Sequence, residues 1–79
     1  MEHAIKTLRD KRKWTQKQFA DELERLTGVR VGIAMIGHVE NFIRNFSYAD
    51  CVEIERAFKI PVAKIRTPES LLRTSSRAA

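Results

Sequence analysis

The sequence predicts a compact, all-helical domain of five helices, and three observations lead to that prediction. No alternating run of apolar and polar residues is long enough to form a strand. Only three glycines and two prolines interrupt the 79 residues, so long segments are left free to form helices. Apolar residues recur at the three- and four-residue spacing of helices that bury one face. A chain of this length forms one domain with a thin core.

The strongest local signal places the start of a helix at residue 16. Thr15 and Gln18 fit a capping box, in which a hydroxyl caps the helix and an amide three residues later reaches back to the cap. Trp14 and Phe19 lie where two apolar side chains form a hydrophobic staple. We therefore expect a helix at residues 16–26. Its inward stripe is Phe19, Ala20, Leu23 and Leu26.

Shorter signals place the other helices. A helix is expected before it at residues 2–13, and another after it from residue 32 or 33 to residue 40. Gly28 can adopt the left-handed backbone that separates the second helix from the third. Ser47 can cap a fourth helix, and Pro61 suits the first position of a short fifth. The inward-facing residues of these helices are Ala4, Ile5, Leu8, Ile36, Val39, Cys51, Ile54 and Phe58.

The amino-acid composition limits the classes of function that the chain can have. Fifteen Lys and Arg face ten Asp and Glu, which favours a polyanionic partner, although solvated helix faces account for the same charges equally well. A single cysteine and two histidines predict neither a disulfide nor a metal site, and we expect no cofactor. No apolar run approaches a membrane span and no signal peptide is evident, so a cytoplasmic protein is expected. No catalytic set of residues is found, so we expect no enzyme.

Several pairs of residues, in their order and spacing, resemble a known family. They are Leu8-Arg9, Trp14-Thr15-Gln16, Phe19-Ala20, Ile36, Val39-Glu40-Asn41, Ile54, Ala57-Phe58 and Ile60-Pro61. This pattern resembles the Cro/CI-type helix-turn-helix regulators, which include phage repressors, restriction–modification controller proteins and antitoxins. The resemblance implies a lambda-repressor-like fold, in which the second and third helices form the helix-turn-helix. It implies a DNA-binding domain at residues 1–66 and leaves a C-terminal extension, residues 67–79, with one short helical turn and then disorder.

The resemblance also implies roles for single residues. Base-reading positions fall on Ile33, Ala34 and His38, and Arg30 joins them from the preceding loop. Phosphate-binding positions fall on Gln16, Lys17, Asn41 and Arg44, at the start of the second helix and after the third. A structural ion pair is expected between Arg9 and Glu40, as a clamp between the first and third helices.

The expected partner is double-stranded DNA, which a homodimer binds at a two-fold symmetric operator. The regulator's own promoter is a candidate location for that operator. Contact with RNA polymerase is the expected route to any activation. We expect the dimer surface in the C-terminal third, where the apolar residues exceed what a thin core can enclose. These residues are Phe58, Ile60, Val62, Ile65, Leu71 and Leu72. A protein-interaction module or antitoxin-like protein on the same fold stays open as the alternative, because Ile33 and Met35 offer apolar surface.

Overall fold

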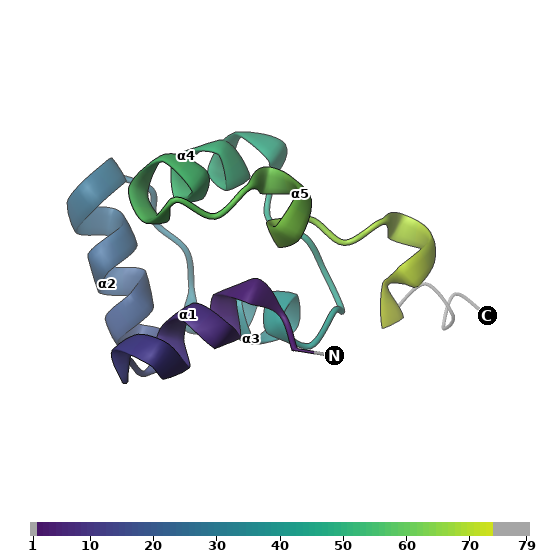
Figure 1. Cartoon of the computed structure of the whole chain (residues 1–79), viewed down its shortest axis with the longest axis horizontal. Helices are drawn as coiled ribbons and strands as arrows, with labels where there is room; N and C mark the ends of the chain where they lie inside the picture. Colours follow the sequence, from purple (N-terminus) through teal and green to yellow (C-terminus); the bar gives the residue numbers. More distant parts are fainter. Residues whose placement is uncertain (1, 74–79) are drawn as a thin grey trace.

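Five α-helices and one short 3-10 turn make up the computed structural model, which describes residues 2–73 (Figure 1). In order they are α1 (Ala4–Arg12), α2 (Gln16–Thr27), α3 (Ile33–Glu40), α4 (Tyr48–Phe58), α5 (Val62–Ile65) and η1 (Glu69–Leu71). Residues 2–73 contain no strand. The all-helical, five-helix prediction is confirmed. Disorder was expected toward the end of the C-terminal extension, and residues 74–79 lie outside the described residues.

The caps of α2 follow the sequence signals closely. The Thr15 hydroxyl accepts from the Gln18 N–H at 3.1 Å, and the Gln18 side chain accepts from the Thr15 N–H at 2.8 Å. Gly28 ends the helix in the left-handed conformation, with φ 79°. Leu26 departs from the prediction, because 46% of it is exposed. It lies about 60° around the helix from Leu23, since each residue turns the chain by roughly 100°.

The helix α1 is shorter than expected at both ends. His3, instead of forming part of the helix, caps it: its Nδ1 accepts a hydrogen bond from the Ile5 N–H at 3.0 Å. At the other end Lys13 adopts a left-handed conformation, with φ 58°. The chain can therefore turn directly into α2, and the two helices are joined by three residues.

The core draws on every helix and on one connecting segment. α2 packs against α3 and α4, while α1 packs against α3 and α5. Phe46, in the connection between α3 and α4, is 2% exposed and was not predicted, because it belongs to no periodic stripe. Cys51 is fully buried among these side chains, and burial raises the pKa of its thiol. The core residues are Ile5, Phe19, Leu23, Ile36, Val39, Phe46, Cys51, Ile54, Phe58 and Ile65.

Two residues assigned to the dimer surface belong to this core instead. Phe58 is 6% exposed and Ile65 is 1% exposed within the single chain. The expectation that a thin core cannot enclose them is wrong, because Phe58 packs against the rings of Trp14 and Phe19. The remaining four residues assigned to that surface are half-buried or exposed: Ile60, Val62, Leu71 and Leu72.

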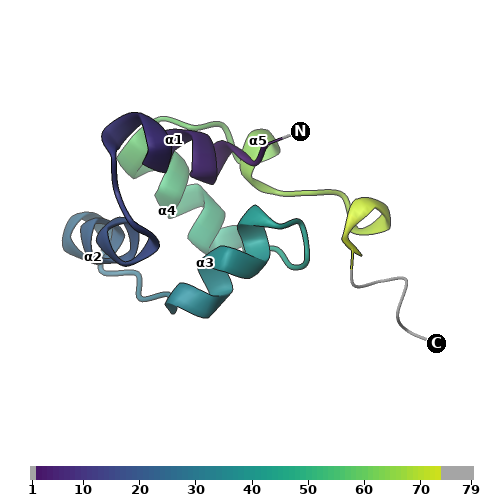
Figure 2. The same cartoon turned by 90° about the horizontal axis from the view of Figure 1, so that it is seen from below.

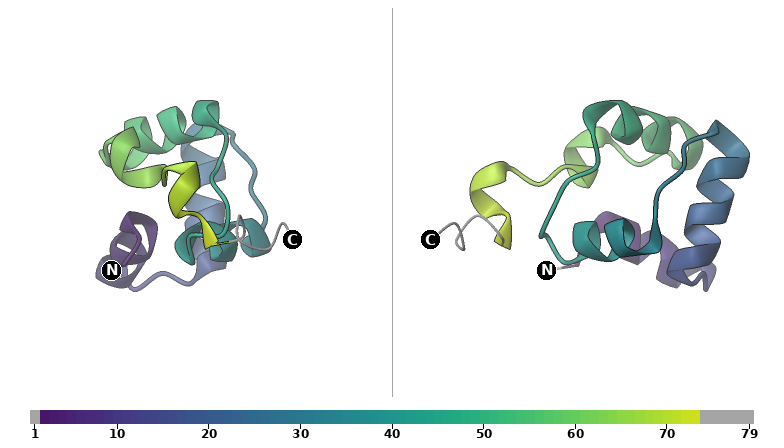
Figure 3. Two further views of the ribbon diagram at one scale, coloured as in Figure 1. Left: turned by 90° about the vertical axis from the view of Figure 1, so that its right-hand side faces the viewer. Right: turned by 180° about the vertical axis from the view of Figure 1, so that it is seen from behind.

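The segment after α5 is fastened to the connection between α3 and α4. The Asn45 amide donates to the Thr67 carbonyl and accepts from the Thr67 N–H, both at 2.8 Å. Arg66 donates to the Phe46 carbonyl at 3.0 Å, and the Arg73 N–H donates to the Phe42 carbonyl at 2.7 Å. These bonds hold the extension beside the connection, although η1 stands away from the other helices (Figure 3).

Candidate nucleic-acid interface

The start of α2 presents backbone N–H groups to the outside. The Thr15 hydroxyl accepts a hydrogen bond from the Gln18 N–H. The N–H groups of Gln16 and Lys17 find no acceptor within their own helix, because no helical turn precedes them. The helix dipole adds partial positive charge at this end, so it suits an anion such as a phosphate. Gln16 and Lys17, both expected at phosphates, are therefore at the end of α2 that favours one.

A buried network joins this end of α2 to α1 and α3. Glu40, 7% exposed, accepts from Arg9 Nε at 2.6 Å and from Arg9 Nη2 at 2.9 Å. The same carboxylate accepts from the Gln16 amide at 3.2 Å, and Arg9 also donates to the Trp14 carbonyl at 2.9 Å. The hydrogen bonds to Glu40 raise the pKa of Arg9, which keeps the guanidinium charged. The structure thus brings Arg9, Gln16 and Glu40 together and fixes the relative positions of three helices.

One face of α3 carries the predicted base-reading side chains. Ile33 is 47% exposed, and Ala34 and His38 are exposed beside it. The opposite face is held in the core by Ile36 and Val39. The helix begins at Gly32, which supplies no side-chain cap. Figure 2 shows α3 along one side of the molecule, next to α2.

Two of the residues that were predicted to contact DNA form ion pairs with acidic side chains of α2. Lys17 Nζ lies 3.1 Å from a carboxylate oxygen of Asp21. Arg30 Nε lies 3.0 Å from a carboxylate oxygen of Glu24. Exposed ion pairs of this kind contribute about 0–1 kcal/mol, so a phosphate or base can displace either carboxylate.

The residues that follow α3 are placed differently from one another. The Asn41 amide donates to the Gly37 carbonyl at 2.9 Å, so it satisfies the end of its own helix. Arg44 is exposed, and its backbone N–H bonds to the His38 carbonyl at 3.4 Å. Its side chain makes no ion pair or hydrogen bond with any residue in the range 2–73. Arg44 is therefore the predicted phosphate contact whose charge is not already matched.

Other kinds of site are not indicated by the described residues. Within residues 2–73, no group of three or more His, Cys, Asp or Glu side chains is arranged to hold a metal ion. No described helix is long and apolar enough to cross a membrane.

Sequence reasoning missed two residues that tie distant segments of the chain together. His3 and Asn45 each bond to a backbone group more than 20 residues away in the chain, at Ile65 and Thr67. A local pattern gives no sign of such a contact. Only His3 could have been found from the sequence, since a polar residue directly before an apolar helical stripe is a candidate cap.

The sequence was compared with known families and proteins. A family model described as Helix-turn-helix matches residues 5–65. The matched stretch runs from the second residue of α1 to the last residue of α5 and so includes the network and the exposed face of α3. No curated protein and no solved structure matches the chain.

Proposed function

Because the chain belongs to the Cro/CI-type family of DNA-binding helix-turn-helix regulators, we propose that it represses or activates genes as a homodimer on a two-fold symmetric operator. The observation that carries the proposal is the exposed face of α3. Ile33, Ala34 and His38 have no side-chain partner among residues 2–73, while the other face of the same helix is fixed in the core. A rigid helix with an unoccupied face suits the major groove.

The three residues suit different base contacts. Ile33 and Ala34 have no polar side-chain atoms, so they read apolar features such as the methyl group of thymine. His38 can donate to or accept from a base edge. Gln16, Lys17, Asn41 and Arg44 surround them and take phosphates, which fix the position of the protein without reading sequence.

A dimer follows from the size of this surface. One short helix contacts few base pairs, and a two-fold dimer doubles the site by reading half-sites about 34 Å apart. Ile60, Val62, Leu71 and Leu72 supply the proposed dimer surface, because they remain half-buried or exposed in the single chain. Regulation of its own promoter, a cytoplasmic location and contact with RNA polymerase complete the proposal.

A second candidate is a protein-interaction module that keeps the fold without reading DNA. It is favoured by the apolar character of the exposed face, where Ile33 on α3 and Leu26 on α2 are each nearly half exposed. The two candidates differ in their response to salt. Binding to phosphates weakens steeply as salt rises, because counterions are released, whereas apolar association does not.

The test is a titration of fluorescent duplex DNA at several salt concentrations with the wild type and with Arg44→Ala. We expect steep salt dependence, with the logarithmic slope reduced by about 1 in Arg44→Ala. The matched control is Arg56→Ala, which removes an exposed arginine on α4, a helix away from α3 in Figure 1. Equal slopes for the wild type and Arg44→Ala, or binding that does not respond to salt, would contradict the proposal.

A further inference from the structure

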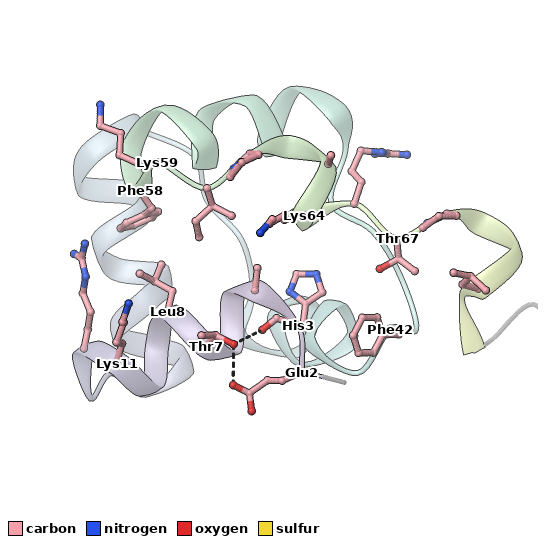
Figure 4. A pocket seen from close by; sticks show the side chains of 18 of the residues that line it. Glu2, His3, Thr7, Leu8, Lys11, Phe42, Phe58, Lys59, Lys64 and Thr67 are labelled. Atoms are coloured by element: carbon pink, nitrogen blue, oxygen red, sulfur yellow. Dashed lines mark hydrogen bonds between the residues drawn. The ribbon is translucent and has the colours of Figure 1, made fainter.

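A broad groove lies between α1 and the chain that runs from the end of α4 through α5 (Figure 4). Leu8 of α1 and Phe58 at the end of α4 point into it. The groove lies on the side of α1 and α5, whereas α3 lies along the other side of the molecule (Figure 2). Its apolar lining consists of Ala4, Leu8, Phe42, Phe58, Ile60, Pro61, Ala63, Pro68 and Leu71.

The charged side chains around this groove are almost all basic. Among the described residues that line it, Glu2 is the one acid. The basic residues are Lys11, Arg12, Lys59, Lys64, Arg66 and Arg73. In Figure 4, Lys11 reaches from α1 and Lys64 from α5 toward the space between the two helices, while Lys59 follows α4 and points away from that space.

All three lysines of this set lack an acidic partner among the described residues. Lys11, Lys59 and Lys64 are exposed and form no ion pair with any residue between 2 and 73. Cations elsewhere on the molecule are mostly neutralised by their neighbours. The pairs are Lys6–Asp10, Arg9–Glu40, Lys17–Asp21, Arg25–Glu22, Arg30–Glu24 and Arg56–Glu53. The unmatched positive charge of the described chain is therefore concentrated around the groove, away from α3.

We propose that this groove binds an acidic, amphipathic helical segment of a partner protein. Such a segment places an apolar stripe on the floor and its carboxylates against the lysines at the rim. A nucleic acid is the less suitable polyanion. A phosphate backbone cannot bind the aliphatic side chains of the floor. Little aromatic surface is left for a base to stack on, because Phe58 is 6% exposed and Phe42 is half-buried against the ring of His3.

A second copy of the chain is the rival occupant, because Ile60 and Leu71 belong both to the groove and to the proposed dimer surface. A two-fold contact places the same patch on both partners. Lys11 and Lys64 of one copy would then lie near the equivalent cations of the other, and like charges across an interface weaken binding. The charge of the groove therefore favours a partner of opposite sign, and the proposed dimer then depends on Val62 and Leu72, which do not line the groove.

The probe is a fluorescent helical peptide of about 14 residues, or four turns, with Leu at helical spacing and Glu at the other positions. Its binding is followed by fluorescence polarisation, and the bound surface is located by NMR amide shifts. We expect binding that shifts amides of α1 and α5. A scrambled peptide of identical composition serves as the comparison, since it keeps the charge and loses the apolar stripe.

Two protein variants separate the groove from general charge attraction. In the double variant Lys11→Glu with Lys64→Glu, we expect affinity for the probe to fall by about tenfold or more. The matched control is Lys13→Glu. Lys13 is exposed, carries no ion pair within the described range and does not line the groove. The affinity of this variant for the probe should therefore stay within about twofold of the wild type.

Four results would overturn the proposal. Equal binding of the probe and the scrambled peptide would show attraction by charge alone, and equal losses in the double variant and in Lys13→Glu would show the same. A random single strand or duplex that displaces the probe and shifts the same amides at lower concentration would assign the groove to nucleic acid. Self-association of the free protein that is altered by the double variant, with no binding of the probe, would assign it to a second copy.

Discussion

His3 combines two structural roles in one buried imidazole. Its Nδ1 accepts from the Ile5 N–H and its Nε2 donates to the Ile65 carbonyl at 2.9 Å, so it caps α1 and ties it to the end of α5. Only a neutral ring can accept at Nδ1. Burial lowers the pKa of His3 from its ordinary value of 6.5, and the hydrogen bond to Ile65 opposes that effect in part.

The stability of the protein should consequently fall in mild acid. Below pH 6.5 the unfolded chain takes up a proton that folded His3 resists, so unfolding becomes easier as the pH drops toward the lowered folded pKa. The slope approaches about 1.4 kcal/mol per pH unit in that window. Urea unfolding between pH 7.5 and pH 5 should show it, and His3→Asn, which keeps a capping side chain, should be less sensitive. The same slope in both proteins would contradict this role.

Glu40 is the residue on which three helices depend. Removing its carboxylate leaves the guanidinium of Arg9, whose side chain is 12% exposed, without a counter-charge, and leaves Gln16 without its acceptor. We expect Glu40→Ala to lower the free energy of unfolding by about 3 kcal/mol, measured by urea unfolding at neutral pH. The matched control is Glu22→Ala, which removes the half-buried partner of the exposed Arg25 and should change stability little. Equal effects of the two changes would count against a buried network.

At the scale of elements, the caps were the predictable part. The capping box of α2, Gly28 and the Ser47 cap of α4 are each set by residues within a few positions of one another, so the sequence reveals them directly. The inward positions Ile36, Val39 and Cys51 were predicted for the same reason, because helical spacing is local. Contacts between distant segments were not predictable in this way.

Phe46 and Asn45 illustrate that limit. Both lie in a connection without periodicity, and their partners are set by how the chain folds back. Asn45 matches two backbone groups of Thr67, 22 residues away, as a strand partner would. Neither residue type nor spacing distinguishes it from a solvent-exposed loop asparagine. The ion pair of Lys17 with Asp21 can be predicted from the four-residue spacing on a helix. The ion pair of Arg30 with Glu24 cannot, because it crosses the end of α2.

The hold of Asn45 on the extension can be tested directly. Asn45→Ala removes two hydrogen bonds, and we expect a loss of stability of about 1–2 kcal/mol, together with faster amide hydrogen exchange at Thr67. Asn41→Ala is the comparison, since its amide bonds only within the end of α3 and should leave exchange at Thr67 unchanged. Unaltered exchange at Thr67 in Asn45→Ala would show that the extension is held by other contacts.

For the whole molecule, the net charge of +5 is a poor guide to where DNA binds. Near α3, Lys17 and Arg30 are matched by acids of α2, and the unmatched cation beside that helix is Arg44. The attraction of this face for phosphates therefore depends on the start of α2 and on the few cations that can exchange partners. Most of the remaining unmatched charge of residues 2–73 surrounds the groove between α1 and α5.

The proposed function requires that α3 read DNA within a two-fold homodimer. The most direct measurement is selection from a randomised duplex library with the wild type and with His38→Ala. We predict two inverted half-sites with centres about 34 Å apart. In His38→Ala, discrimination at matched positions of both half-sites should fall by about 1–3 kcal/mol. A selected motif without two-fold symmetry, or no enrichment above the starting library, would contradict the claim.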